Sequence, residues 1–209
     1  MIEHLIYDFD GTIADSYPLF VRFLREGAKK RGYRIKCTDE ELYRSAKINI
    51  YETYRVIGGE EVVPFRIFID DFHELQHSCR NEFPMFPEAR ELLLRATAAG
   101  RHNYIYTHTG PVVKDMLANM GVLDQFDFIL DASYNFPMKP APDALLFFLD
   151  RFGFDPKTCM MIGDRPIDAL AGQNAGMYGC LWDADGLFSP EGIDYYIKDL
   201  FEVSEIVGI

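Results

Sequence analysis

Two carboxylates follow the first apolar run of the sequence, where the letters LIY at residues 5–7 lead into DFDGT at residues 8–12. An apolar run that ends at a glycine predicts a buried strand followed by a tight turn. Asp8 and Asp10 are two residues apart, so they leave such a strand on the same side. Their mutual repulsion favours a bound cation, and Mg²⁺ prefers oxygen ligands of this kind. The alternative is an ordinary Asp-Gly surface turn.

A second polar motif, YIYTHTG at residues 104–110, runs from an apolar segment into an expected helix. The Thr107 hydroxyl and the free backbone N–H groups at a helix start form an anion site. Lys139 lies in MKPAPD at residues 138–143, where two prolines stiffen the loop. An ammonium held there can neutralise a phosphoryl oxygen or a carboxylate. Taken singly, the threonine is also explained by helix capping and the lysine by simple exposure.

The fourth motif is GDRPID at residues 163–168. Asp164 ends an expected strand and Asp168 follows one helical turn later, so both carboxylates can face one metal ion. The alternative is a helix-capping aspartate with an exposed partner.

Alternating helices and strands position these motifs from residue 88 onward. Helical spacing is expected over 89–99, 112–120 and 143–152, and strands over 103–107, 126–130 and 159–162, with a last strand ending near Trp182. Helices between short apolar strands predict a doubly wound, Rossmann-like α/β core with a parallel sheet covered on both faces. In such sheets the chemistry lies at the carboxyl ends of the strands, where every motif above falls.

Residues 16–82, between the first strand and the rest of the core, are predicted to be helical throughout. Gly32 is expected to end the first helix, Thr38 and Glu41 to form a capping box, and Pro64 to stand in the first turn of a later helix. The predicted domains are therefore an α/β core, 1–15 with 83–209, and an inserted α-helical cap domain, 16–82.

Composition limits the cellular context. The chain has 209 residues, 48% of them hydrophobic, but no uncharged apolar run long enough for a membrane span. The first residues lack a basic signal-peptide start, and the four cysteines form no CxxC pair, so a cytoplasmic protein with reduced thiols is predicted. A net charge of −12 argues against nucleic-acid and anionic membrane partners. Residues 18–80 hold 12 Lys and Arg against 10 Asp and Glu, which is either a solvated helical surface or a basic lid over an acidic core.

The four motifs in this order resemble the haloacid dehalogenase-like superfamily over the whole chain, including a helical cap after the first motif. The letters GVL at 121–123 and NAGM at 174–177 are similar to its phosphoglycolate-phosphatase-like branch. The resemblance implies a phosphatase that acts on a small anionic phosphate monoester through an aspartyl-phosphate.

That resemblance assigns a role to each motif residue. Asp8 is implied as the nucleophile and Asp10 as the general acid and base. Mg²⁺ is implied at the Asp8 carboxylate, the Asp10 carbonyl and Asp164, with Asp168 assisting. The phosphoryl oxygens are implied to lie at Thr107 and the His108 N–H, with Lys139 balancing their charge.

Asp10 favours phosphate monoesters, because a dehalogenase needs no leaving-group acid and P-type ATPases have a lysine there. A phosphomutase of the same superfamily is the main alternative, and a non-catalytic binding protein is disfavoured because no motif residue is missing. His108 departs from the superfamily, where many members have Asn or a small residue; its ring either contacts substrate or packs at the rim.

A rival motif, HELQH at residues 73–77, matches the zinc-peptidase pattern HExxH. The extension with a third histidine is absent, and His73 and His77 are expected to be exposed beside the apolar face of their helix. Coincidence is therefore the preferred explanation over a zinc metallopeptidase using Glu74.

Substrate choice is expected to depend on the cap. A turn is predicted near residues 45–49, and a cap loop of the resembling branch reaches the active site at about this place. Lys47, with Arg44 as the second choice, is predicted to contact the leaving group of a phosphoglycolate-like substrate. The alternative is a lysine that only complements its helix dipole.

Overall fold

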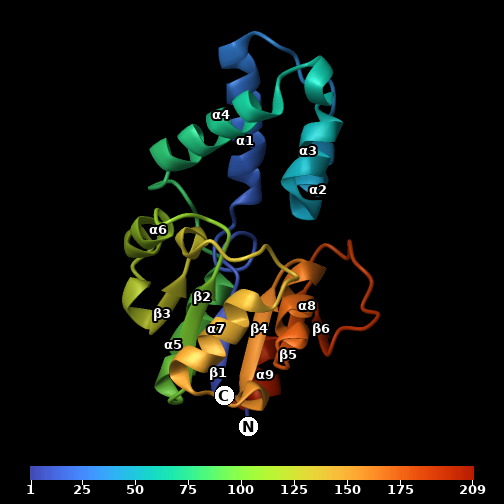
Figure 1. Cartoon of the computed structure of the whole chain (residues 1–209). Helices are drawn as coiled ribbons and strands as arrows, with labels where there is room; N and C mark the ends of the chain where they lie inside the picture. Colours follow the sequence, from blue (N-terminus) through green and yellow to red (C-terminus); the bar gives the residue numbers. More distant parts are fainter. The chain divides into compact units, whose positions relative to one another are not determined.

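The computed structural model of the protein describes residues 1–209. The chain forms two compact units (Figure 1), an α/β unit of Met1–Ala14 with Met85–Ile209 and a helical unit of Asp15–Pro84. Where the chain leaves and re-enters the α/β unit, Ala14 and Met85 form an antiparallel bridge, and the Phe86 N–H donates to the Ile13 carbonyl at 3.1 Å. The two crossing segments are thus tied together at the edge of the α/β unit.

The α/β unit is built on a six-stranded sheet of order β3-β2-β1-β4-β5-β6, in which every neighbouring pair is parallel. Its strands are β1 (His4–Tyr7), β2 (His102–Tyr106), β3 (Phe128–Leu130), β4 (Cys159–Gly163), β5 (Tyr178–Trp182) and β6 (Tyr195–Ile197). Every residue of the central strand β1 is buried, as expected for a parallel sheet with both faces covered. The predicted doubly wound α/β architecture is confirmed.

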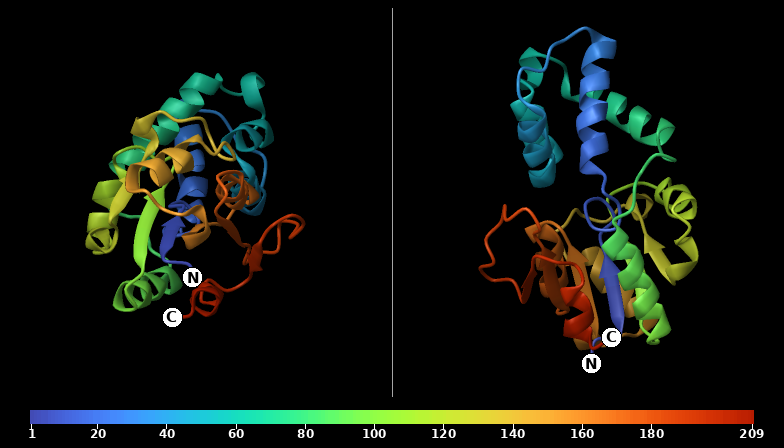
Figure 2. Two further views of the ribbon diagram at one scale, coloured as in Figure 1. Left: turned by 60° about the horizontal axis from the view of Figure 1, so that its bottom comes forward. Right: turned by 180° about the vertical axis from the view of Figure 1, so that it is seen from behind.

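Helices cover both faces of this sheet. They are α5 (Pro87–Ala98), α6 (Val113–Asn119), α7 (Asp143–Phe152), α8 (Pro166–Asn174) and α9 (Glu202–Val207), with 3₁₀ turns at Leu123–Gln125, Ala132–Tyr134 and Pro156–Thr158. Figures 1 and 2 show α7 and α8 on one face and α5 and α9 on the other. On the α7 side, Leu145, Phe148 and Ala171 pack with Ile6 and Met161 in one buried cluster.

The register of the central strands brings their carboxyl ends level. Tyr7 of β1 is aligned with Ile105 of β2 on one side and with Ile162 of β4 on the other. The residue after each of these positions therefore lies at the same edge of the sheet. Both chain termini lie at the opposite end of the unit in Figure 1.

The last part of the chain differs from the prediction, which ended the sheet near Trp182. The short strand β6 adds to β5 beyond that point, and α9 follows it. A buried carboxylate holds the intervening loop: Asp183 accepts hydrogen bonds from the Leu187 and Phe188 N–H groups at 2.9 and 3.0 Å and from the Tyr196 hydroxyl at 2.8 Å.

The helical unit contains α1 (Tyr17–Arg31), α2 (Asp39–Ile48), α3 (Ile50–Val56), a 3₁₀ turn at Gly59–Glu61 and α4 (Phe65–Ser78). Gly32 ends α1 in the left-handed conformation and Thr38 forms the predicted capping box with Glu41. Pro64 is the N-cap of α4 and stands one position before the first turn, which corrects the expectation. No helix in the chain has both the length and the apolar character that crossing a bilayer requires.

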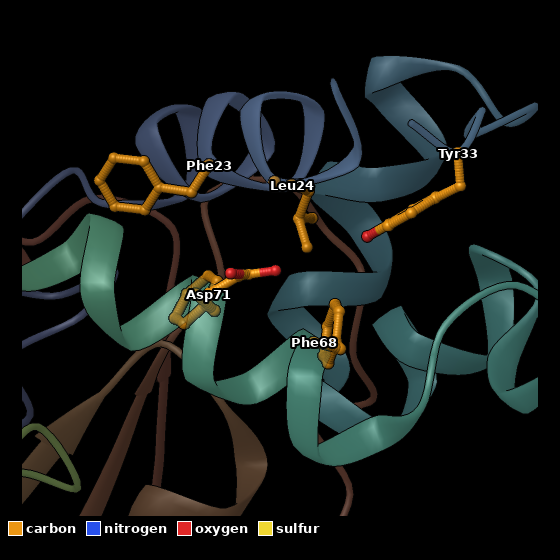
Figure 3. A pocket seen from close by; sticks show the side chains of 7 residues that line it. Phe23, Leu24, Tyr33, Phe68 and Asp71 are labelled. Atoms are coloured by element: carbon orange, nitrogen blue, oxygen red, sulfur yellow. The ribbon is translucent and has the colours of Figure 1, made fainter. Parts of the chain in front are cut away.

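A buried carboxylate joins α1 to α4 inside the helical unit. Asp71 is buried and accepts two hydrogen bonds from Arg31, at 2.8 Å each. Figure 3 shows Asp71 among the residues that line a small cavity, with Phe23 and Phe68. The Arg31 hydrogen bonds keep the pKa of Asp71 below its usual value against the opposing effect of burial. The small cavity beside it, also lined by Tyr33, has a volume of about 10 Å³, room for about one water molecule. Asp71 therefore forms a structural ion pair with Arg31.

Candidate active site

The end of β1 presents a buried carboxylate at the sheet edge. Asp8 is 2% exposed, and its Oδ2 atom is buried without a hydrogen-bond partner. Gly11 adopts φ 79° in the turn that follows, a conformation that a residue with a side chain rarely takes. Asp10 accepts a hydrogen bond from the Thr109 hydroxyl at 2.6 Å. The first motif thus forms a strand end and tight turn, with its second carboxylate attached to the loop after β2.

Lys139 lies at the centre of the site, with a side chain that is fully buried. Its ammonium donates to Asp8 Oδ1 at 2.9 Å, to Asp168 Oδ1 at 2.8 Å and to the Tyr106 carbonyl at 2.9 Å. Burial alone lowers the pKa of Lys139, but the Asp168 and Asp8 carboxylates outweigh burial and raise it above its ordinary value. The lysine is therefore charged at neutral pH and fixes one oxygen of Asp8.

Asp164 and Asp168 come from the end of β4 and the first turn of α8. With Asp8 they form a buried group in which one oxygen of each carboxylate lies within 4.8 Å of the others. Any side chain at Gly163 would collide with the Asp168 carboxylate, so this glycine allows α8 to bring Asp168 close to the strand. Three buried carboxylates, one with an oxygen lacking a hydrogen bond, fit a hard divalent cation such as Mg²⁺.

The loop after β2 carries Thr107, His108 and Thr109. Thr107 is buried, and its hydroxyl oxygen accepts a hydrogen bond from the Thr109 N–H at 3.0 Å. The Nε2 atom of His108 accepts a hydrogen bond from the Lys139 N–H at 3.3 Å. Burial, followed by the nearby Lys139 and Arg165 charges, lowers the pKa of His108 to about 4. The imidazole is therefore neutral at pH 7, and its ring holds the lysine loop.

The structure thus brings together, within one unit, all the core residues singled out in the sequence. It also adds residues that were not singled out: Thr109 on Asp10, the Tyr106 carbonyl on Lys139, and the guanidinium of Arg165 beside Asp8 and Asp168. Arg165 lies between Asp164 and Asp168 in the fourth motif, so the sequence alone indicated a basic residue near these carboxylates.

The two cap residues predicted to contact substrate differ in their surroundings within the helical unit. Lys47 is buried, and its ammonium lies 5.5 Å from the ring centre of Tyr17 and 5.8 Å from that of Tyr43. Arg44 is exposed and donates to Glu40 one turn earlier on α2 at 2.6 Å. Because its side chain is buried, Lys47 differs from a solvated lysine at a helix end.

The rival HExxH motif lies on α4. His73 and His77 are exposed, as expected, and Glu74 forms an ion pair with Lys30 at 2.7 Å. The three residues do not belong to a group of ligands close enough to hold a metal ion. The glutamate that a zinc peptidase would use as its base is engaged in holding α4 to α1.

The fold and the site define an α/β enzyme with a cluster of carboxylates and one buried lysine at the carboxyl ends of its strands. The family model for haloacid dehalogenase-like hydrolases matches residues 5–181. The chain belongs to the haloacid dehalogenase-like hydrolase family.

Individual relatives agree with this assignment. A phosphoglycolate phosphatase of Vibrio vulnificus is 26% identical over 197 residues, covering 84% of this chain and 81% of the relative. A pyrophosphatase of Bacillus velezensis is 25% identical over 223 residues, covering 100% of this chain and 97% of the relative. The crystal structure of a hydrolase of the same superfamily from Geobacter sulfurreducens has a TM-score of 0.75 at 24% identity, covering 99% of this chain and 100% of that one. The chain is accordingly an enzyme of this family, of the phosphatase type.

Proposed function

We propose that the protein is a Mg²⁺-dependent phosphatase that hydrolyses a small anionic phosphate monoester through a phosphorylated Asp8. The observation that carries the proposal is the environment of Asp8. Lys139 holds its Oδ1 atom, while its Oδ2 atom is buried without a hydrogen bond. A carboxylate with one oxygen held by a cation and the other without a hydrogen-bond donor is suited to attack as a nucleophile.

Asp8, Asp164 and the Asp10 backbone carbonyl would hold Mg²⁺, with Asp168 assisting. The ion would neutralise charge on the phosphoryl oxygens and align them for in-line attack. Asp168 also binds Lys139 through Oδ1 and the Arg165 N–H through Oδ2, so its main contribution is to position those two residues around the nucleophile.

In the first step, Asp8 Oδ2 forms a bond to phosphorus while the bond to the leaving oxygen breaks. Asp10 donates its proton to that oxygen, so the product leaves as an alcohol. The hydrogen bond from the Thr109 hydroxyl fixes the Asp10 carboxyl group at one oxygen. The other oxygen of Asp10 carries the transferred proton.

In the second step, water attacks the phosphorus of the aspartyl-phosphate. Asp10, now a carboxylate, takes a proton from this water, and the Asp8–phosphorus bond breaks to release inorganic phosphate. Asp8 returns as a carboxylate and Asp10 as an acid. The Thr107 hydroxyl and the His108 backbone N–H bind the phosphoryl oxygens in both steps, and the Lys139 ammonium balances their charge.

Phosphoglycolate and pyrophosphate are the two substrates whose hydrolysis by this protein should be compared first. Phosphoglycolate and pyrophosphate appear in the names of relatives that cover most of this chain, and both are small, multiply charged anions.

The helical unit acts as a cap in this proposal, and Lys47 supplies a cation for the leaving group, with Arg44 as the second choice. The buried position of Lys47 against two tyrosine rings supports a fixed ammonium over a mobile one.

The proposal is tested with a panel of phosphate monoesters and pyrophosphate, assayed with Mg²⁺ and with EDTA. Mg²⁺-dependent phosphate release from at least one small anionic monoester is expected, and its absence from the whole panel would contradict the proposal. For the cap, Lys47→Ala should raise KM for phosphoglycolate far more than KM for an aryl phosphate, because the aryl leaving group has no carboxylate. Equal changes for both substrates would remove Lys47 from substrate binding.

A further inference from the structure

A second basic side chain lies beside the nucleophile, from a residue to which the proposed mechanism assigns no contact with substrate. The guanidinium of Arg165 has one nitrogen 4.0 Å from Asp8 Oδ2 and another 4.0 Å from Asp168 Oδ2. Its side chain is only 17% exposed. Arg165 is thus part of the buried site and faces the oxygen of Asp8 that Lys139 does not hold.

The local sequence keeps this side chain in place. Pro166 forces the preceding residue out of the helical conformation, and Arg165 is accordingly extended, with φ −124° and ψ 148°. The Arg165 N–H donates to Asp168 Oδ2 at 3.1 Å. The backbone is therefore fixed on both sides, and Asp168 ties Arg165 to the same carboxylate group that binds Lys139.

The two cations take different positions around Asp8. Lys139 makes direct hydrogen bonds to the carboxylates, whereas the guanidinium distances of 4.0 Å exceed hydrogen-bond length. Asp8 Oδ2 is the oxygen with no hydrogen-bond partner, so a phosphorus atom attacked by Asp8 lies on this side. The oxygens of that phosphoryl group would come within reach of the guanidinium.

The chemistry of arginine fits this position. A guanidinium is planar and always charged, and its parallel N–H groups bind two phosphoryl oxygens at once. The side chain also affects its surroundings, since Arg165 contributes with Lys139 to the lowered pKa of His108. Lys139, His108 and Arg165 are therefore close enough to interact electrostatically.

We propose that Arg165 is a phosphate-binding residue that holds oxygens of the substrate phosphoryl group and of the phosphorylated Asp8. This inference rests on the proposed phosphatase function and adds a second cation to its phosphoryl site. Four carboxylates of the site then face two protein cations in addition to the divalent ion. The site would bind a dianionic phosphoryl group more tightly than one with Lys139 alone.

The alternative role for Arg165 is that of a counterion for Asp8 and Asp168 only. The two roles predict opposite effects of removing the charge. If Arg165 binds phosphate, removal of its charge weakens the binding of phosphate by the protein. A simple counterion competes with the divalent ion for the same carboxylates, so its removal would tighten Mg²⁺ binding and leave phosphate affinity unchanged.

The experiment compares Arg165→Met and Arg165→Lys with wild type, with Arg95→Met as the matched control. Arg95 is an exposed arginine of the same unit, paired with Glu91 on α5. Isothermal titration calorimetry gives the Kd of orthophosphate at saturating Mg²⁺ and, separately, the Kd of Mg²⁺. Circular dichroism and thermal melting confirm that each variant is folded before titration.

Arg165→Met should weaken orthophosphate binding about 10- to 100-fold, as expected for loss of a charge-assisted hydrogen-bonded contact. Arg165→Lys should recover part of this loss, and Arg95→Met should bind like wild type. In assays with an aryl phosphate, KM should rise in the same order. Orthophosphate affinity of Arg165→Met within about twofold of wild type would overturn the proposal, whether or not Mg²⁺ binds more tightly. Failure of the phosphatase proposal itself would show separately, as a wild-type protein without Mg²⁺-dependent turnover.

Discussion

The neutral, partly buried imidazole of His108 makes a quantitative prediction for stability against pH. Its pKa is lowered from 6.5 to about 4 in the folded protein, chiefly by burial and then by the charges of Lys139 and Arg165. The unfolded chain therefore binds a proton at this residue between those two values, and the folded protein does not. By linkage, the free energy of unfolding must fall as pH decreases through this window.

The size of the effect follows from the two pKa values. Each unit of difference is worth about 1.4 kcal/mol once the pH lies below the unfolded value. A decrease from about pH 7.5 to about pH 5 should therefore lower the free energy of unfolding by about 2 kcal/mol through His108. His108→Gln removes the titrating group and keeps a hydrogen-bond acceptor at a similar position for the Lys139 N–H.

Urea denaturation in EDTA at several pH values between these limits measures the effect. Over this range the free energy of unfolding of the wild type should fall by about 2 kcal/mol more than that of His108→Gln. His73→Gln is the control, because His73 is exposed on α4, and it should follow the wild type. Equal slopes for wild type and His108→Gln would refute the assignment of a neutral, partly buried His108.

Three further variants test how the site and its surroundings are held. Lys139→Met should lower the free energy of unfolding in EDTA by about 3–5 kcal/mol, because two buried carboxylates lose their partner, and Mg²⁺ should restore part of the loss; a change under about 1 kcal/mol in urea titrations would argue against a buried ion pair. Gly163→Ala should abolish most turnover through collision with Asp168, whereas Gly110→Ala, where an added side chain meets open space, should not; similar kcat values for both would contradict this packing. Burial raises the pKa of Asp183, but hydrogen bonds from the Phe188 and Leu187 N–H groups outweigh burial and lower it. This stabilisation is present above the unfolded pKa and is lost as pH falls through the folded one. Asp183→Asn should therefore cost about 1.5–3 kcal/mol at neutral pH and show a weaker acid dependence below about pH 4; an unchanged acid dependence in urea melts would remove Asp183 as the loop anchor.

The sequence was sufficient to predict the sheet and the core motifs because each motif directly follows an apolar strand. Asp8, Thr107 and Asp164 leave parallel strands at one edge, so predicting the strands also predicts their convergence. The strand β6 was missed for a physical reason. It has three residues after a long loop, and it exists because β5 and the Asp183 carboxylate hold it, which are contacts that local patterns do not contain.

Side-chain directions were harder to predict than residue positions. The spacing of Asp164 and Asp168 predicted a shared metal site, but nothing in that spacing tells where the Arg165 guanidinium points. The role of His108 was likewise open, because the hydrogen bond from the Lys139 N–H joins two loops 31 residues apart in the chain. Lys47 illustrates the same limit: its helix end was predicted, but neither its burial nor the nearby rings of Tyr17 and Tyr43 were.

Chemical trapping of the intermediate tests the central claim, that Asp8 carries the phosphoryl group, most directly. The enzyme is mixed with Mg²⁺ and its best substrate, quenched in acid during turnover, and treated with borohydride, which reduces an aspartyl-phosphate to homoserine. Peptide mass spectrometry should then find homoserine at position 8 only when both substrate and Mg²⁺ were present, and none in Asp8→Asn, which should also have lost turnover. Rapid turnover by Asp8→Asn, or homoserine at another aspartate of an active enzyme, would contradict the account.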